Sequence, residues 1–117
     1  MEWTVEAIKK LADENPDGFT VDVKTGKKVT KGVAVGMTHG LTAFDAAVLA
    51  NVYQESDTNT QFSHRTVGGW KDGEKYIIDL GVTTQTIDEA VEFGTAYRQD
   101  AVFDLNINEC IYLKNGA

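Results

Sequence analysis

Apolar residues recur at two spacings along the chain, and these spacings predict three helices and six strands. Spacings of three and four residues, typical of one helix face, follow Thr4, run from Thr42 to about Gln54, and follow Thr86. Alternating apolar and polar residues, typical of half-buried strands, fill the segments between them. The predicted order is α-β-β-α-β-β-α-β-β, an α+β fold with about three helices on one face of an antiparallel sheet of hairpins.

Residues 67–105 carry the most consistent local signals. Asp72-Gly73 separates two strand-like runs, and this pair suits the positive φ of a tight hairpin turn. Residues 76–82 then alternate, and Thr86 to Glu89 has the spacing of a capping box at a helix start. A returning strand from Ala101 and a last strand to Leu113 are expected to form the closing hairpin.

The first part of the chain predicts a helix followed by a hairpin. Thr4 is expected to cap the helix, and Asn15-Pro16 is expected to end it, because a residue before proline is pushed out of the helical region. Residues 19–24 and 29–37 are expected to pair through a turn at Thr25-Gly26 that is rich in lysine.

The middle of the chain predicts the second helix and a long polar loop. The helical stripe expected to face the sheet consists of Phe44, Val48 and Val52. Residues 54–64 are polar apart from Phe62, and a loop of this length inside a compact domain is often functional. Its two carboxylates are Glu55 and Asp57.

The composition favours one intracellular globular domain, residues 1–117. An apolar fraction of 42% and a single proline fit a compact core without a long linker. No apolar run approaches the roughly 20 residues that span a bilayer, and the first residues do not resemble a basic signal peptide. Cys110 is the only cysteine, which excludes an internal disulfide and fits a reducing cytoplasm. We therefore expect a cytoplasmic protein that does not contact membranes.

Acidic charge gathers in the second half of the chain. The net charge is −7, and residues 76–113 contain seven acids against Arg98. This distribution argues against direct nucleic-acid binding through that half and favours a basic partner surface. Mild acidity for solubility explains the same charge without a partner, and both interpretations stay open.

Few residues suggest catalysis or a cofactor. His39 and His64 are the only histidines, and their spacing to each other and to Cys110 matches no metal motif. Cys110 lies in an apolar run, where a buried and inert thiol is expected. Asp79 is the carboxylate placed where burial could raise its pKa, whereas a solvated or hydrogen-bonded Asp79 is the simpler expectation. We therefore expect neither a metal, nor a cofactor, nor an enzyme.

Trp70 has two possible roles. A large ring favours burial in a small domain, so core packing is the simpler expectation. Tryptophan is also enriched among binding hot spots, so an exposed interface anchor is the alternative. The glycines before it, Gly68 and Gly69, indicate a bulge or a close backbone approach within the strand.

Most of the chain outside residues 38–64 carries a recurring pattern, Gly68-Gly69-Trp70, Tyr76, Asp79, Glu89-Ala90, Phe93-Gly94, Gln99, Ala101 and Phe103-Asp104-Leu105. With this pattern the chain resembles small uncharacterised proteins of phages and other mobile elements. Gly18 to Asp22, with Thr25-Gly26 and Lys31-Gly32, is similar to the first hairpin of some of them, whereas residues 38–64 are not covered. The resemblance implies an anti-defence context, in which small acidic proteins bind and block nucleases of CRISPR or restriction systems.

These observations lead to one main functional hypothesis and two alternatives. We expect a non-enzymatic inhibitor that binds a basic, nucleic-acid-handling host protein. The expected partner-binding residues are Asp88, Glu89, Glu92, Asp100, Asp104, Trp70, Glu55 and Asp57. One alternative is a small-ligand or hydrolytic module that uses His39, His64 and Asp79. The other is an accessory domain that self-associates through a β edge.

Overall fold

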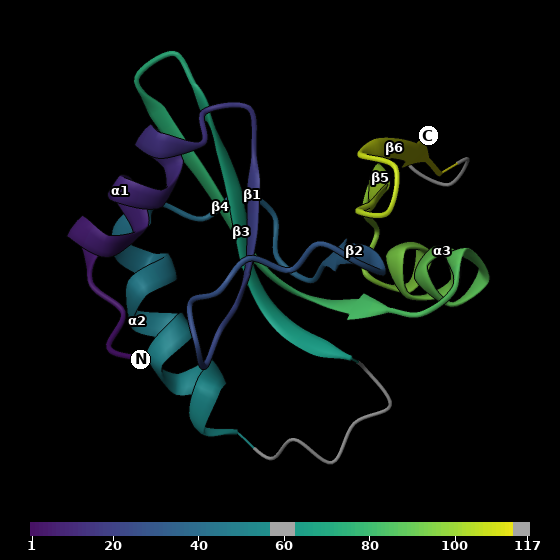
Figure 1. Ribbon diagram of the computed structural model, residues 1–117, viewed down its shortest axis with the longest axis horizontal. Helices are drawn as coiled ribbons and strands as arrows, with labels where there is room; N and C mark the ends of the chain where they lie inside the picture. The colour runs from purple at the N-terminus through teal and green to yellow at the C-terminus, as the bar shows by residue number, and fades with distance from the viewer. Residues whose placement is uncertain (57–62, 114–117) are drawn as a thin grey trace.

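The computed structural model describes residues 1–56 and 63–113. Its elements follow the predicted order (Figure 1). They are α1 (Val5–Glu14), β1 (Phe19–Asp22), β2 (Val33–Gly36), α2 (Ala43–Glu55), β3 (His64–Asp72), β4 (Lys75–Thr84), α3 (Ile87–Ala96), β5 (Ala101–Asp104) and β6 (Glu109–Tyr112). The predicted α+β class is confirmed.

The six strands form one antiparallel sheet in the order β1-β3-β4-β2-β5-β6. The predicted hairpins β3–β4 and β5–β6 are confirmed. The β3–β4 turn lies one residue later than predicted, because Asp72 pairs with Lys75 and leaves Gly73 and Glu74 in the loop. Gly73 has a φ of 62°, which suits the first position of such a two-residue turn.

The predicted hairpin between β1 and β2 is wrong beyond its turn. The chain does reverse after β1, where the Asp22 amide donates to the Lys27 carbonyl at 2.9 Å and Val21 forms an isolated bridge with Lys28. It then turns again at Gly32, whose φ is 94°, and β2 pairs with β4 and β5 instead. This position buries Val33 and Val35 against α3, which a simple hairpin with β1 would not do.

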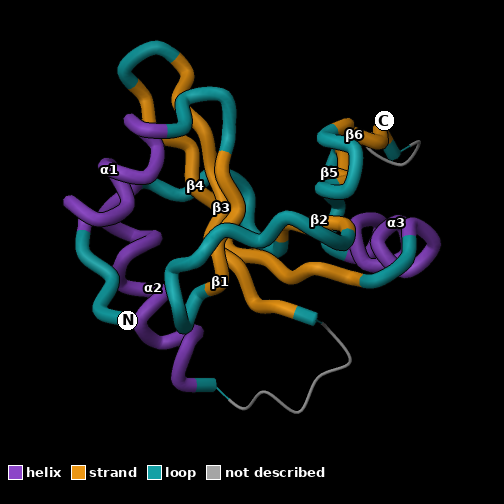
Figure 2. Tube along the Cα trace, viewed as in Figure 1, coloured by secondary structure: helices purple, strands orange, loops and turns teal. Residues whose placement is uncertain are grey.

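All three helices cover the same face of the sheet. Along β4, Ile78 and Leu80 pack in a core with α1 and α2, and Val82 packs in a second core with α3. These three residues are two apart in a strand, so their side chains point to the same face. Figure 2 shows α1 and α2 beside β3 and β4, and α3 beside β2. Among residues 1–56 and 63–113, no helix therefore lies on the opposite face of the sheet.

The helix starts agree with the sequence, but the buried face of α2 does not. Thr4, Thr42 and Thr86 each accept a hydrogen bond from the backbone amide three residues later, as predicted for the first and third helices. On α2 the expected stripe points outward, and Phe44 and Val52 are each 65% exposed. The buried residues are Ala43, Ala46, Ala47 and Ala50. Small side chains let this helix lie close to α1 and the sheet, and the larger residues are left on the outside.

Candidate functional site

The helix-free face of the sheet lines a groove of about 1050 Å³. Side chains on this face belong to the residues that alternate with the core residues, so the groove follows from the one-sided placement of the helices. Small residues occupy much of its floor, and three aromatic residues, Phe19, Trp70 and Phe103, also line it. The lining residues that matter below are Gly36, Gly68, Trp70, Asp79, Gly81 and Phe103. A groove with a few polar groups is the usual form of a binding site.

Trp70 lies in this groove and is 44% exposed. Of its two predicted roles, core packing is wrong. Trp70 is three residues from the core residue Val67 along β3, so the two side chains point to opposite faces, and Trp70 faces away from the helices. The pairing of β3 is regular through Gly68 and Gly69, so the glycines do not form a bulge. The close backbone approach is confirmed, since a Cβ at Gly69 would lie 2.6 Å from the Ile77 carbonyl oxygen.

Asp79 is a half-buried carboxylate in the same groove. The Thr38 hydroxyl donates to its Oδ1 at 2.9 Å, and the Gly40 amide donates to the same oxygen at 2.7 Å. Burial raises the pKa of Asp79 above its usual 3.8, and these hydrogen bonds only partly oppose the change. The structure thus combines both sequence-based interpretations: Asp79 is hydrogen-bonded, as the simpler one expected, and burial also raises its pKa.

Gln99 lines the groove and bonds to Thr38, which in turn holds Asp79. The Gln99 side chain donates to the Thr38 carbonyl at 3.1 Å, and its Oε1 would lie 3.1 Å from a Cβ at Gly36. The Leu80 amide donates to the Thr38 hydroxyl at 3.1 Å. Neither Thr38 nor Gln99 was among the predicted site residues. The glycines at 36, 68 and 81 within strand-like runs could have indicated this region, since such glycines often mark a close approach, but of these only Gly68 was singled out from the sequence.

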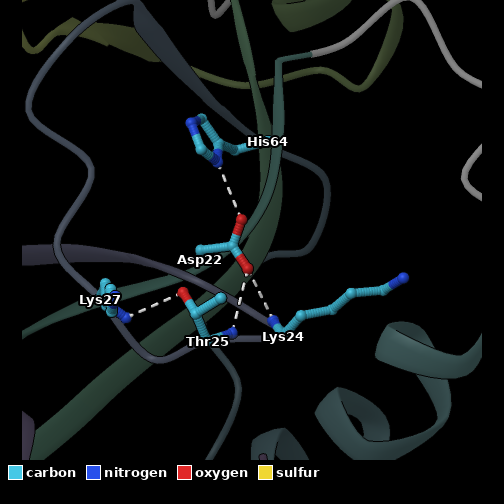
Figure 3. A network of polar contacts seen from close by, with 5 residues as sticks. All are labelled: Asp22, Lys24, Thr25, Lys27 and His64. Atoms are coloured by element: carbon cyan, nitrogen blue, oxygen red, sulfur yellow. Dashed lines mark hydrogen bonds and ion pairs between the residues drawn. The ribbon is translucent and has the colours of Figure 1, made fainter.

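A second polar network holds the turn after β1 (Figure 3). Asp22 Oδ1 accepts hydrogen bonds from the backbone amides of Lys24 and Thr25, at 2.8 and 3.1 Å. Asp22 Oδ2 lies 2.8 Å from His64 Nδ1, which joins the turn to the start of β3. Burial works to raise the pKa of Asp22, but the His64 and amide hydrogen bonds outweigh it and lower the pKa below 3.8.

The groups of the hydrolytic alternative do not converge. His64 bonds to Asp22, whereas His39 Nε2 lies 3.1 Å from the Tyr97 carbonyl oxygen. His64 pairs with Thr83, four residues along β4 from Asp79, which corresponds to roughly 13 Å at strand spacing. Cys110 is exposed on β6, so the predicted burial of its thiol is wrong: it lies on the helix-free face of an edge strand. Within residues 1–56 and 63–113, no three His, Cys, Asp or Glu side chains gather as a metal site.

The predicted acidic residues fall in several places. Asp88 and Glu92 are exposed one helical turn apart on α3, and Asp100 is exposed just after it. Glu89 is partly buried, and its carboxylate lies 3.0 Å from the Thr86 hydroxyl in the predicted capping box. Exposed Glu109, on β6 beside β5, adds a carboxylate that was not among the predicted site residues.

Three further predicted residues do not belong with these exposed carboxylates. Asp104 is buried and accepts hydrogen bonds at 2.9 Å from the backbone and side chain of Asn106. Its carboxylate fixes the β5–β6 turn and is not presented to a partner. Glu55 ends α2, which packs with α1 in the other half of the molecule, and Asp57 lies outside the described residues.

Comparisons with known proteins do not add a function to this geometry. No protein-family model, curated protein or solved structure matches the chain. Among the described residues, no helix has both the length and the apolar character needed to cross a membrane. The function must therefore be argued from the charge and shape of the described surface.

Proposed function

We propose that the protein is a non-enzymatic inhibitor that binds a basic, nucleic-acid-handling protein inside a host cell. The partner class is a defence nuclease of the CRISPR or restriction type, as the resemblance to phage proteins suggests. The contact surface in this proposal is the acidic surface, defined as Asp88, Glu92, Asp100 and Glu109. These four carboxylates are exposed on α3, on the turn after it and on β6.

The observation that supports the proposal is the separation of charge between two parts of the fold. Residues 85–113 contain six carboxylates and a single base, Arg98, and they form α3, β5 and β6. Every lysine that the structure describes lies in residues 1–75. In Figure 1, α3, β5 and β6 lie together on one side of β2, away from α1 and α2. The acidic surface is therefore one side of the molecule.

An acidic side suits a protein whose natural ligand is a polyanion. A nuclease binds the phosphate backbone through a basic groove, and a negative surface is attracted to the same charges. Complementary charge of this kind mainly speeds association and selects the partner, and it weakens as salt screens it. The proposal therefore predicts a salt-sensitive complex that competes with nucleic acid.

The test is affinity capture from bacterial lysate with the wild-type chain and with an Asp88→Lys, Glu92→Lys variant. We expect wild type to enrich nucleic-acid-handling proteins at low salt, and the variant to lose at least tenfold of that enrichment. A matched control, Glu2→Lys with Glu6→Lys, makes the same charge change at exposed residues beside and on α1, and it should retain capture. Equal loss in both variants, or equal retention, would contradict a specific role of the acidic surface.

A further inference from the structure

The groove places a half-buried carboxylate beside an exposed indole. Trp70 pairs with Ile77, and Asp79 is two residues further along β4, so Trp70 and Asp79 are diagonal neighbours on one face. Diagonal neighbours lie roughly 7–8 Å apart between Cα atoms. Both residues line the groove. An aromatic face and a carboxylate at this separation leave room for a flat cation between them.

Gly68 leaves the position opposite Asp79 without a side chain. It is the direct cross-strand partner of Asp79, and Gly81 is the next neighbour of Asp79 on the same face of β4. Gly36 is the cross-strand partner of Gly81 on the other side of β4. At these two glycines the neighbouring atoms lie close, because a Cβ at Gly81 would clash with the Val35 carbonyl oxygen and one at Gly36 would be 3.1 Å from Gln99 Oε1. The side of Asp79 that a cross-strand side chain would normally cover is therefore the side next to Gly68.

Asp79 forms no hydrogen bond or ion pair with a cation in the described part of the chain; His39 is near enough for its charge to act on Asp79, but its Nε2 lies beside the Tyr97 carbonyl oxygen. Both hydrogen bonds to Asp79, from Thr38 and Gly40, go to Oδ1, and Oδ2 accepts none from the described residues. Lys28 also lines the groove, but its Nζ donates to Asn15 Oδ1 at 3.2 Å. A half-buried carboxylate oxygen that faces a groove without a donor is a natural acceptor for a ligand.

We propose that this groove holds an arginine side chain of the partner, with the guanidinium bonded to Asp79 Oδ2 and stacked on Trp70. The inference rests on the proposed function only in taking the partner to be a basic protein. Arginine fits better than lysine because its planar guanidinium stacks on an aromatic ring and is more weakly hydrated than an ammonium. Its donors also form strong, directional bonds with a carboxylate.

The probe is N-acetyl-arginine N-methylamide, titrated into the full chain and followed by amide NMR spectra. We expect saturable shifts in the low millimolar range at the Trp70 indole N–H and at the amides of Gly68 and Gly81. The lysine analogue should bind several-fold more weakly. The citrulline analogue has nearly the same shape but no charge, and it should cause no saturable shift at these positions.

Two variants test the contacts. Asp79→Asn keeps an acceptor for Thr38 and Gly40 and removes the charge, so binding should weaken at least tenfold. Trp70→Leu alters an exposed ring, and binding should weaken about threefold; this variant decides the question if Asp79→Asn fails to fold. Asp45→Asn, at an exposed residue of α2 outside the groove, should change binding less than twofold.

The inference is overturned if arginine causes no saturable shift, if citrulline binds as well as arginine, or if Asp79→Asn binds unchanged. Citrulline binding would indicate a neutral hydrogen-bonding ligand instead. The result is independent of the capture experiment, which alters Asp88 and Glu92. If the acidic-surface variant and its control behave alike in the capture experiment while arginine still binds the groove, only the acidic-surface proposal is removed. If the capture experiment gives the expected difference but arginine does not bind, only the groove inference is removed.

Discussion

At the scale of single residues, two aspartates of the same sheet face show how local donors decide a carboxylate's pKa. Asp22 and Asp79 both experience burial, which raises a carboxyl pKa. Asp22 receives two backbone amides and a histidine on its two oxygens, and its pKa falls below the usual value. Asp79 receives donors on one oxygen, and its pKa stays raised. The same residue type thus fixes a turn at position 22, whereas at position 79 it keeps one carboxylate oxygen without a hydrogen bond from the described residues.

The raised pKa of Asp79 predicts a pH-dependent effect of Asp79→Asn on stability. Because the folded state binds the Asp79 proton more tightly than the unfolded state, ionisation lowers stability as pH rises from 3.8 through the folded pKa. Asparagine does not ionise, so the variant should be more stable than wild type at pH 7, with the difference vanishing below pH 3.8. Urea unfolding across pH measures this. A difference that favours wild type increasingly above pH 4 would show that the charge stabilises the fold.

Arg98 predicts a stabilising substitution. It has a φ of 56° and ends α3, where its amide donates to Thr95 and the Gln99 amide donates to Gly94. This is the position at which glycine is preferred, because a Cβ is disfavoured in the left-handed region. Arg98→Gly should raise the free energy of unfolding by about 0.5–1 kcal/mol. Arg98→Ala keeps the Cβ and should give no gain; a gain with alanine would instead point to the removed charge.

At the scale of elements, local signals were predictable and long-range choices were not. Helix caps and tight turns depend on neighbouring residues, so Thr4 and Thr86 were identified from the sequence. The place of β2 depends on which sheet edge and which helix can bury its valines, and alternation alone does not specify a partner strand. The prediction of the buried face of α2 was wrong for a related reason. Larger apolar residues suggest the core, but this helix packs so close to its neighbours that only its alanines fit there.

Because the alanines of α2 are buried and its valines are exposed, substitutions at these two kinds of position should differ in their effect on stability. Val48→Gln and Val52→Gln change exposed residues, so each should alter the free energy of unfolding by no more than about 0.5 kcal/mol. Ala46→Leu adds volume where the side chain is fully buried and should destabilise by about 1–3 kcal/mol. Urea unfolding followed by circular dichroism compares them. If Val52→Gln is strongly destabilising and the effect grows with protein concentration, the stripe is covered by self-association.

At the scale of the whole molecule, the candidate site was predictable in its chemistry and not in its location. Asp79 was singled out as the carboxylate whose pKa burial could raise, although a solvated or hydrogen-bonded state was the simpler expectation, and the acidic charge of the second half is a property of the sequence. The groove exists because α1, α2 and α3 all pack on the other face of the sheet, and because β2 pairs with β4 and so brings Gly36 beside Gly81. The acidic list was too broad, because Glu89 and Asp104 are used by a helix cap and a turn.

The two hydrophobic cores predict that the molecule does not open as one unit. The core under α1 and α2 contains thirteen buried residues, whereas the core under α3 contains five, so the α3 half buries less apolar surface. Amide hydrogen exchange in β5 should therefore be at least about tenfold faster than in the centre of β3. Val102→Ala, which removes part of the smaller core, should destabilise that half by about 2 kcal/mol and speed exchange in β5 and α3.

The matched substitution in the larger core is Val67→Ala on β3, where the side chain is also fully buried. Because the larger core carries the global stability, this variant should speed exchange throughout the chain, including β5. Val102→Ala should leave β1 and β3 protected. If both variants speed exchange equally everywhere, the halves open together, and the acidic surface is held as rigidly as the rest of the fold. If the two variants differ as expected, the α3 half, which carries the acidic surface, can adjust to a partner while β3 and β4, which carry Trp70 and Asp79 of the groove, stay folded.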